Sequence, residues 1–293
     1  MIILYKVNKK SKYKSVYTCV YTLYFIRKVH KLNKSKFREK YGSWAVVSGA
    51  TNGIGRAFVE ELILLKFNIV IIGRNQDALN ELSKKIERNN LQCSPLNLDL
   101  SLPNSIDKVF EATDKLDVGL IVLSAGFGNY GDFIENNLSD NCKMIDLHCK
   151  TRMRMCHHFG NIFKAKKRGG IINLSSIVAY QGTMQAANYS AVNAFLQNFN
   201  EGIGMELKKY SVDVLSVCPG PVDTGFEKTA KMKFLLSSSA KTVANASIKS
   251  LGRKATVFPG ILAKVLHYSL HGLLSRRLKV AIYNLAFKLL VKA

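Results

Sequence analysis

Short apolar runs alternate with longer amphipathic stretches from Trp44 onward. Apolar runs of roughly four to eight residues between turn signals are typical of buried strands, whereas an apolar residue at every third or fourth position is typical of a helix. The helical pattern is clear over residues 53–67. The expected strands are residues 44–48, 69–72, a short run ending near 98–99, then 120–123, 171–174, 212–217 and 257–258.

Strands that alternate with helices in this way predict an α/β fold. The pattern fits one doubly wound parallel sheet of the Rossmann type, with about seven strands and helices on both faces. Because right-handed crossovers leave few other topologies, we expect the strand order 3-2-1-4-5-6-7. The chain of 293 residues is 47% apolar, which suffices for one such domain over residues 40–260 with a flanking segment at each end.

Charge distinguishes the two flanking segments from the centre. The formal net charge is +23, yet residues 1–38 carry 11 Lys or Arg and residues 228–293 carry 13, with no acidic residue in either segment. The centre is nearly neutral. We therefore predict a basic N-terminal extension over 1–39 and a basic amphipathic C-terminal tail over 261–293.

The basic ends suggest a partner. Basic segments mixed with Tyr, Phe and Leu suit an anionic membrane surface, whereas a nucleic-acid-binding protein more usually carries its charge on a folded face. We expect peripheral membrane association and no nucleic acid, with a solubilising flank as the alternative. For the tail, packing on the domain or on a second subunit of a homo-oligomer also stays open. No apolar run reaches the roughly 18–20 residues that span a bilayer.

The six cysteines show no C-x-x-C pair and no spacing typical of disulfides, which favours reduced thiols and an intracellular protein. This would be endoplasmic-reticulum-like in a eukaryote, or else cytoplasmic. Cys142, Cys149 and Cys156 are seven residues apart. We expect this spacing to mark one buried helix face; a metal site with the neighbouring His148, His157 and His158 is the alternative, and we expect none.

Candidate chemistry begins with the glycine-rich stretch that follows the first expected strand. Gly49, Gly53 and Gly55 open the helix that comes next. Glycines here let the backbone approach a pyrophosphate, which then lies against free amides at the positive end of the helix dipole. With Thr51, Asn52 and Ile54 between the glycines, the loop predicts a dinucleotide-binding catalytic domain.

With this loop, the chain resembles the short-chain dehydrogenase/reductase family. The stretch YGSWAVVSGAT at 41–51 is particularly similar to the branch of 3-ketoacyl-CoA reductases and 17β-hydroxysteroid dehydrogenases. The resemblance covers about residues 40–260 and includes Asn97-Leu98-Asp99, Ser175-Ser176, Tyr189 and Pro219-Gly220. The cofactor-binding residues that it implies are Gly49, Thr51, Asn52, Gly53, Ile54, Gly55, Arg74, Asp99, Ser124, Gly126, Pro219 and Gly220.

The end of the second expected strand bears on the choice of cofactor. An enzyme that prefers NAD usually has Asp or Glu there to bind the ribose 2′-hydroxyl, whereas an Arg favours the 2′-phosphate of NADP. This chain has Gly73 followed by Arg74. We therefore predict NADP as the cofactor, with a solvated turn arginine as the alternative.

The resemblance also implies a catalytic pair. Hydride transfer to a carbonyl leaves negative charge on oxygen, so a proton donor and a second hydrogen bond are needed. Family members have a Ser 13 residues before a Tyr, and Ser176 and Tyr189 have this spacing. Tyr189 would donate the proton and Ser176 would orient the carbonyl.

Three departures from the family pattern affect the same site. The family lysine one turn after the Tyr, which lowers its pKa, is replaced by Asn193, and the family Asn of the preceding helix is replaced by His148. Ser124 replaces an amide beside Gly126. These losses are typical of a weakened or inactive family member, unless His148 or Lys150 supplies the missing cation.

We therefore expect an NADP(H)-dependent oxidoreductase, a carbonyl reductase or alcohol dehydrogenase of lipid metabolism acting on a fatty-acyl or steroid-like ketone. The alternatives are an inactive relative that binds dinucleotide or a partner at a membrane, and a membrane scaffold that uses only the basic segments. In the family, residues 224–241 would cover the substrate. The apolar residues expected to line that pocket are Phe226, Met232, Phe234, Leu235 and Leu236.

Overall fold

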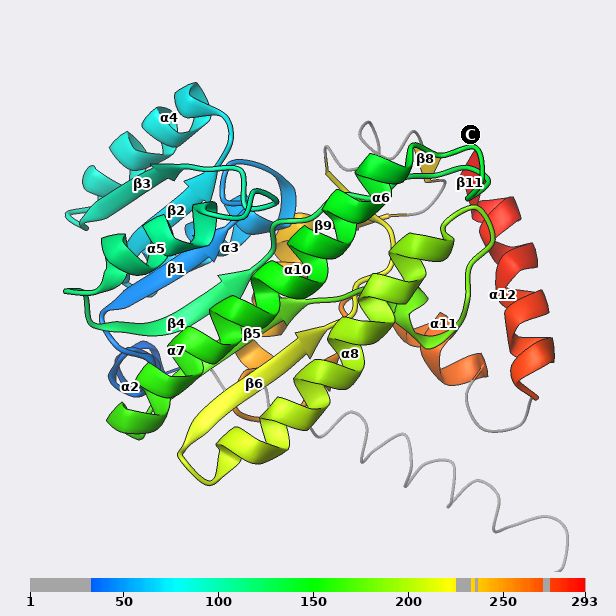
Figure 1. Ribbon diagram of the computed structural model, residues 1–293. Helices are drawn as coiled ribbons and strands as arrows, with labels where there is room; N and C mark the ends of the chain where they lie inside the picture. The colour runs from blue at the N-terminus through cyan, green and yellow to red at the C-terminus, as the bar shows by residue number, and fades with distance from the viewer. Residues whose placement is uncertain (1–32, 225–232, 235–236, 271–274, 293) are drawn as a thin grey trace, which may run out of the picture. The chain divides into compact units, whose positions relative to one another are not determined.

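A seven-stranded parallel sheet forms the centre of the computed structural model, which describes residues 33–224, 233–234, 237–270 and 275–292 (Figure 1). The strands follow the order β10-β6-β5-β4-β1-β2-β3, so the predicted order 3-2-1-4-5-6-7 and the Rossmann-type α/β fold are confirmed. The sheet consists of β1 (Trp44–Ser48), β2 (Asn68–Gly73), β3 (Cys93–Asn97), β4 (Val118–Leu123), β5 (Gly169–Leu174), β6 (Val212–Val217) and β10 (Thr256–Val257).

Helices cover both faces of this sheet (Figure 1). On one face α3 (Gly53–Leu64) packs against α10 (Ala240–Ser250), and on the other α7 (Arg152–Lys166) packs against α5 (Ser105–Thr113), β4 and β5. The other helices of the domain are α2 (Lys34–Tyr41), α4 (Gln76–Glu87), α6 (Leu138–Ile145), the π-helix η1 (Asp146–Thr151), the 3-10 helix η2 (Ile177–Tyr180) and α8 (Ala187–Lys208). Two short strand pairs lie outside the main sheet, β7 (Val222–Asp223) with β9 (Ser238–Ser239) and β8 (Lys233–Phe234) with β11 (Val291–Lys292).

Burial explains the continuous apolar runs. Every residue of β1, β4 and β5 is buried. Phe159 and Phe163 of α7 are fully buried in the main core cluster with these strands, where each large side chain contributes about 1.5–3 kcal/mol. The observed bounds differ from the predicted ones by up to three residues. The first helix ends at Leu64 because Lys66 adopts left-handed φ (64°), and the third strand ends at Asn97.

The C-terminal tail forms two helices, α11 (Ile261–Leu270) and α12 (Arg276–Leu290). Ala263 and Tyr283 are buried against the domain, and the Asn284 side chain accepts a hydrogen bond of 2.7 Å from the backbone N–H of Met184. The tail therefore packs on the domain of its own chain. Among the described helices, none combines the length and the hydropathy needed to cross a membrane.

A π-helical turn, η1, interrupts the helix that carries the evenly spaced cysteines. Cys142 is exposed, Cys149 is half-buried and Cys156 is buried, so the prediction of one buried face was wrong. The wider turn shifts the helical phase between the first cysteine and the last. Within the part of the chain that the structure describes, no group of three or more metal-ligating side chains gathers.

Candidate active site

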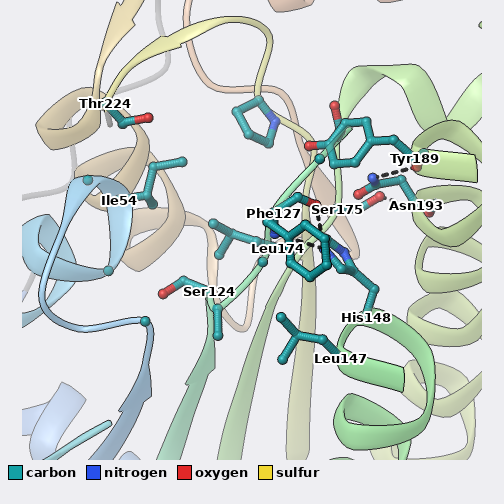
Figure 2. A pocket seen from close by; sticks show the side chains of 18 of the residues that line it. Ile54, Ser124, Phe127, Leu147, His148, Leu174, Ser175, Tyr189, Asn193 and Thr224 are labelled. Atoms are coloured by element: carbon teal, nitrogen blue, oxygen red, sulfur yellow. Dashed lines mark hydrogen bonds between the residues drawn. The ribbon is translucent and has the colours of Figure 1, made fainter. Parts of the chain in front are cut away.

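One pocket lies at the carboxyl ends of the parallel strands, where ligands bind in open α/β sheets (Figure 2). Every catalytic and cofactor-binding residue that the sequence predicted lines it. The catalytic candidates are Ser176, Tyr189, Asn193 and His148, and the cofactor candidates extend from Gly49 of the glycine-rich loop to Gly220 after β6. The segment predicted to cover the substrate begins at Thr224, which lines the pocket; Phe226, Met232, Leu235, Leu236 and the side chain of Phe234 lie outside the described residues.

The glycine-rich loop is packed too tightly for side chains. Gly49 has φ of 66°, and a Cβ there would come within 2.9 Å of the Ala125 backbone. A Cβ on Gly55 would clash with the carbonyl oxygen of Gly49 and come within 2.6 Å of Ser124 Oγ. The Asn52 side chain caps α3 by accepting a 2.8 Å hydrogen bond from the N–H of Gly53. This cradle at a helix N-terminus fits the pyrophosphate of a dinucleotide.

Arg74 and Asp99 lie together at the edge of the pocket. Arg74 follows β2 and is mostly exposed, with Nη1 3.7 Å from Asp99 Oδ2. Burial alone would raise the pKa of Asp99, but hydrogen bonds from Ser101 and the charge of Arg74 outweigh it and hold that pKa below its ordinary value. Asp99 is therefore an anion that faces Arg74. Because the long Arg74 side chain is mostly exposed, its guanidinium can also turn toward a phosphate.

Ser124 joins the ends of β1 and β4 where the family has an amide. Its N–H donates to Ser48 Oγ over 3.1 Å, and its own hydroxyl donates to the carbonyl oxygen of Ser48. The neighbouring Gly126 is needed for packing, since a Cβ there would lie 2.9 Å from His148 Nε2 and 3.2 Å from Arg152 Nη2. The polar link between the strands is thus retained with a different side chain.

Tyr189 and Ser176 meet in the pocket, from α8 and from the end of β5 respectively. Removal from water raises the pKa of Tyr189, while a hydrogen bond with Ser176 and the positive charge of Arg152 oppose that rise. The balance keeps the phenol protonated at neutral pH. Tyr189 can therefore act as a proton donor, and the Ser176 hydroxyl lies beside it.

Asn193 turns back onto its own helix. Its Nδ2 donates a 2.8 Å hydrogen bond to the carbonyl oxygen of Tyr189, and the residue is only 1% exposed (Figure 2). Its backbone carbonyl accepts a hydrogen bond of 3.0 Å from Ser175 Oγ. The side chain brings no charge to the pocket.

His148 and Lys150 do not supply the missing cation. Burial lowers the pKa of His148 to about 3, with a further contribution from the charge of Arg152, so the imidazole is neutral at physiological pH. Its Nε2 lies 3.0 Å from the carbonyl oxygen and 3.2 Å from the nitrogen of Phe127 (Figure 2). Lys150 is exposed and pairs with Asp146 at 2.6 Å. The suggestion that either residue replaces the lysine was wrong.

Arg152 and Tyr283 are among the pocket residues that the sequence did not predict. Arg152 is buried one turn after His148, and Tyr283 reaches the pocket from α12. Burial raises the pKa of Tyr283, and the nearby Tyr189 adds to the effect. Arg152 could have been found from its spacing, because it lies four residues after His148 and such residues share one face of a helix. Nothing local marks Tyr283, because the docking of the tail depends on tertiary contacts.

Comparisons with known proteins show the family. The family model described as short chain dehydrogenase matches residues 43–233. A 7beta-hydroxysteroid dehydrogenase of Mediterraneibacter gnavus is 30% identical over 233 residues, which is 76% of this chain and 88% of that protein. A very-long-chain 3-oxoacyl-CoA reductase of Mus musculus is 32% identical over 225 residues, 75% of this chain and 72% of that protein.

Solved structures show the same fold. A structure from work on 7beta-hydroxysteroid dehydrogenase stereoselectivity has a TM-score of 0.77 at 26% identity and covers 85% of this chain and 98% of that one. A short-chain dehydrogenase from Sphingobium yanoikuyae in complex with NADPH has a TM-score of 0.71 at 18% identity, covering 78% of this chain and 92% of that one. With the match over residues 43–233, the chain belongs to the short-chain dehydrogenase/reductase family.

Proposed function

We propose that this protein is an NADP(H)-dependent oxidoreductase that interconverts a carbonyl and an alcohol on an apolar substrate. The observation that carries the proposal is the contact of Tyr189 with Ser176 in a pocket that also contains the glycine-rich loop. A proton donor beside a second hydroxyl is the arrangement that hydride transfer to a carbonyl requires.

The chain's own residues would divide the work. When bound, the nicotinamide supplies the hydride, or accepts it in the reverse direction. Tyr189 would give its hydroxyl proton to the carbonyl oxygen while Ser176 donates a hydrogen bond to the same oxygen. Removal from water raises the pKa of Tyr189 and favours the protonated phenol, so the resting site is prepared for reduction.

Arg74 supports NADP over NAD. It follows β2 directly, and its mostly exposed guanidinium lines the pocket beside the glycine-rich loop. A guanidinium can form two parallel hydrogen bonds to a phosphate, whereas a 2′-hydroxyl would gain little from it.

The lining of the pocket supports an apolar substrate. Ile177, Val178 and Tyr283 line the pocket and belong to one apolar cluster, against which Tyr189 packs. The similar proteins are named for a hydroxysteroid and for a very-long-chain 3-oxoacyl-CoA, both of which have large apolar parts. These observations support a steroid-like or fatty-acyl ketone.

A panel assay tests the proposal. NADPH oxidation would be followed with a 7-oxo steroid, a long-chain 3-oxoacyl-CoA and several simpler ketones, using the parent protein, Tyr189→Phe and the control Tyr210→Phe, which removes a hydroxyl at the far end of α8. Loss of the tyrosine proton donor should lower turnover by about 10²- to 10⁴-fold. Tight NADPH binding without turnover on any ketone would favour the alternative that this protein is an inactive family member that binds dinucleotide. The replacements of family residues by Asn193 and His148 support that alternative.

We further propose that the basic ends bring the protein to an anionic membrane surface. The 13 Lys or Arg of residues 228–293 are unopposed by acids, and α12 exposes Arg276 and Arg277 beside Leu278 and Ile282. Each basic residue near such a surface contributes about 1 kcal/mol. The protein should sediment with anionic vesicles and be released by salt; equal binding to neutral vesicles would contradict an electrostatic contact.

A further inference from the structure

Arg152 is a buried cation that lines the candidate active site. It is the first residue of α7 and is 4% exposed. Its Nη1 donates to Asn173 Oδ1 over 2.9 Å and to the carbonyl oxygen of Leu174, and its Nη2 donates to the carbonyl oxygen of Ala125 over 2.6 Å. All three acceptors are neutral, and no ion pair with a carboxylate forms among the residues that the structure describes.

Such a charge is costly unless something compensates for it. Removing a guanidinium from water costs several kcal/mol, and carbonyl dipoles return only part of this. Arg154, two residues further along the same helix, shows the ordinary arrangement, since it is more exposed and pairs with Asp107 at 2.6 Å. A full positive charge fixed in the interior without a carboxylate is suited to meet an anion that forms there during the reaction.

A buried network holds the guanidinium in place. Asn173 Nδ2 donates to Asn200 Oδ1 over 2.9 Å, which directs Asn173 Oδ1 toward Arg152. Asn200 Nδ2 in turn donates to Ser216 Oγ over 3.2 Å, and Ser216 Oγ donates to Gln197 Oε1 over 2.5 Å. This chain of polar side chains crosses from β5 through α8 to β6 and is buried throughout, so it fixes one orientation of Arg152.

The group that becomes an anion in the proposed reaction is Tyr189, as its phenolate. Arg152 and Tyr189 line the same pocket, and the ring of His148, one turn before Arg152, has its centroid 6.1 Å from that of Tyr189. The charge of Arg152 opposes the rise that burial causes in the pKa of Tyr189, and Tyr189 in turn opposes the fall that burial causes in the pKa of Arg152. Burial lowers the pKa of Arg152 to about 10, so it remains a cation at neutral pH. The preceding π-helical turn, a feature frequent at functional sites, presents His148 and Arg152 together to the interior.

We propose that Arg152 is the positioning residue that supplies the positive charge behind Tyr189, in the role left empty by the neutral Asn193. The inference rests on the proposed function, in which the phenol loses its proton to the carbonyl oxygen. The resulting phenolate is stabilised by the guanidinium, which keeps all its own protons, and a proton taken up from bulk solvent then reprotonates Tyr189. The cation has moved from the helix of Tyr189 to the neighbouring α7.

This placement couples two of the three departures from the family pattern, those at positions 148 and 193. A lysine at position 193 would add a second buried cation near Arg152, so a neutral Asn193 avoids like-charge repulsion. The same charge contributes to the low pKa of His148, which stays neutral. The replacements at 148 and 193 then follow from the presence of Arg152 and do not indicate a loss of catalytic activity.

The test measures the ionisation of Tyr189 without cofactor or substrate. Protein labelled with ¹³C at tyrosine Cζ is titrated by NMR, with Tyr189→Phe to assign the resonance. The proteins compared are the parent, Arg152→Gln, Arg152→Lys and the matched control Arg154→Gln. We expect the pKa of Tyr189 to rise by at least about one pH unit in Arg152→Gln, which keeps a donor but loses the charge. It should stay within about half a unit of the parent in Arg152→Lys and Arg154→Gln.

Two outcomes would overturn the proposal: an unchanged pKa of Tyr189 in Arg152→Gln, or an equal rise in Arg152→Lys, which would assign the effect to shape. If Arg152→Gln does not fold, Arg152→Gln with Asn193→Lys carries the test, since it restores one cation to the pocket. Its Tyr189 pKa should be at or below that of the parent, and a higher value would overturn the proposal. Because no turnover is measured, an inactive protein with the expected titration would contradict the proposed function alone.

Discussion

The cofactor end and the catalytic end of the pocket are built by different means. At the cofactor end, Gly49 and Gly55 place backbone against backbone, and Arg74 follows β2 without a break. At the catalytic end, Tyr189 comes from α8, and Arg152 from α7 is held by acceptors on β5 and in the loop after β4. The first arrangement is local in sequence and allows little change. The second depends on several elements, so a charge can move from one helix to another while the chemistry is retained.

The rigidity of the cofactor end predicts the largest effect. Gly55→Ala places a methyl group against the Gly49 carbonyl oxygen and Ser124 Oγ, so it should cost about 3 kcal/mol of stability and weaken NADPH binding at least about tenfold. Gly202→Ala is the control, because a Cβ there meets nothing within 4 Å in the middle of α8. It should stabilise the protein by about 0.5–1 kcal/mol. Urea unfolding and NADPH fluorescence titration measure both variants; an intact Gly55→Ala site would contradict the packing argument.

The catalytic end should show its rearrangement in the pH dependence of stability. The pKa of His148 is lowered by burial from 6.5 to about 3 in the folded protein, so below pH 6.5 the unfolded chain binds a proton that the folded chain does not. The parent should therefore lose stability as the pH falls, by about 2 kcal/mol at pH 5 from this residue. In His148→Asn that part of the loss should disappear, whereas the exposed control His157→Asn should behave as the parent. Equal losses in all three proteins would remove His148 from the buried, neutral role.

Arg74 tests whether the cofactor end follows the ordinary rule for NADP. A charge-assisted contact with the 2′-phosphate is worth about 1.5–3 kcal/mol, so NADPH should bind at least about tenfold more tightly than NADH. Arg74→Ala should abolish that preference. The control Arg56→Ala removes a cation that pairs with Glu81 on the outer surface and should leave the preference unchanged. Fluorescence titration with both cofactors decides, and a preference that survives Arg74→Ala would exclude Arg74 from phosphate binding.

The smallest expected effect concerns the tail. Tyr283→Ala removes a buried ring from the substrate side of the pocket and should raise KM for a bulky ketone a few-fold, with little change for a small one. The control is Leu285→Ala, which shortens an exposed side chain on the same helix. Steady-state kinetics with one large and one small ketone would show the difference. Equal effects on both substrates would assign Tyr283 to packing alone.

The sequence predicts the cofactor end better than the catalytic end for a physical reason. The sheet order and the glycine-rich loop follow from periodicity and from steric needs of adjacent residues, and the Ser176–Tyr189 pair follows from family spacing. The function of Arg152 depends on Asn173, 21 residues further along the chain, and on Asn200, another 27 residues further. The π-helical turn that brings it inward has no local sequence signature. The position of Tyr283 in the pocket also depends on tertiary packing, so the sequence does not predict it.

The central claim, that Arg152 now carries the charge expected at position 193, is tested most directly by turnover of four proteins. NADPH oxidation with the best ketone of the panel would be measured for the parent, Arg152→Gln, Asn193→Lys and the double variant. Asn193→Lys alone should change turnover by less than about threefold, because the pocket already contains a cation. In the Arg152→Gln background the same lysine should raise turnover at least about tenfold, which corresponds to about 1.4 kcal/mol of barrier. An equal gain from the lysine in both backgrounds would mean that the two positions act independently, and would contradict the claim.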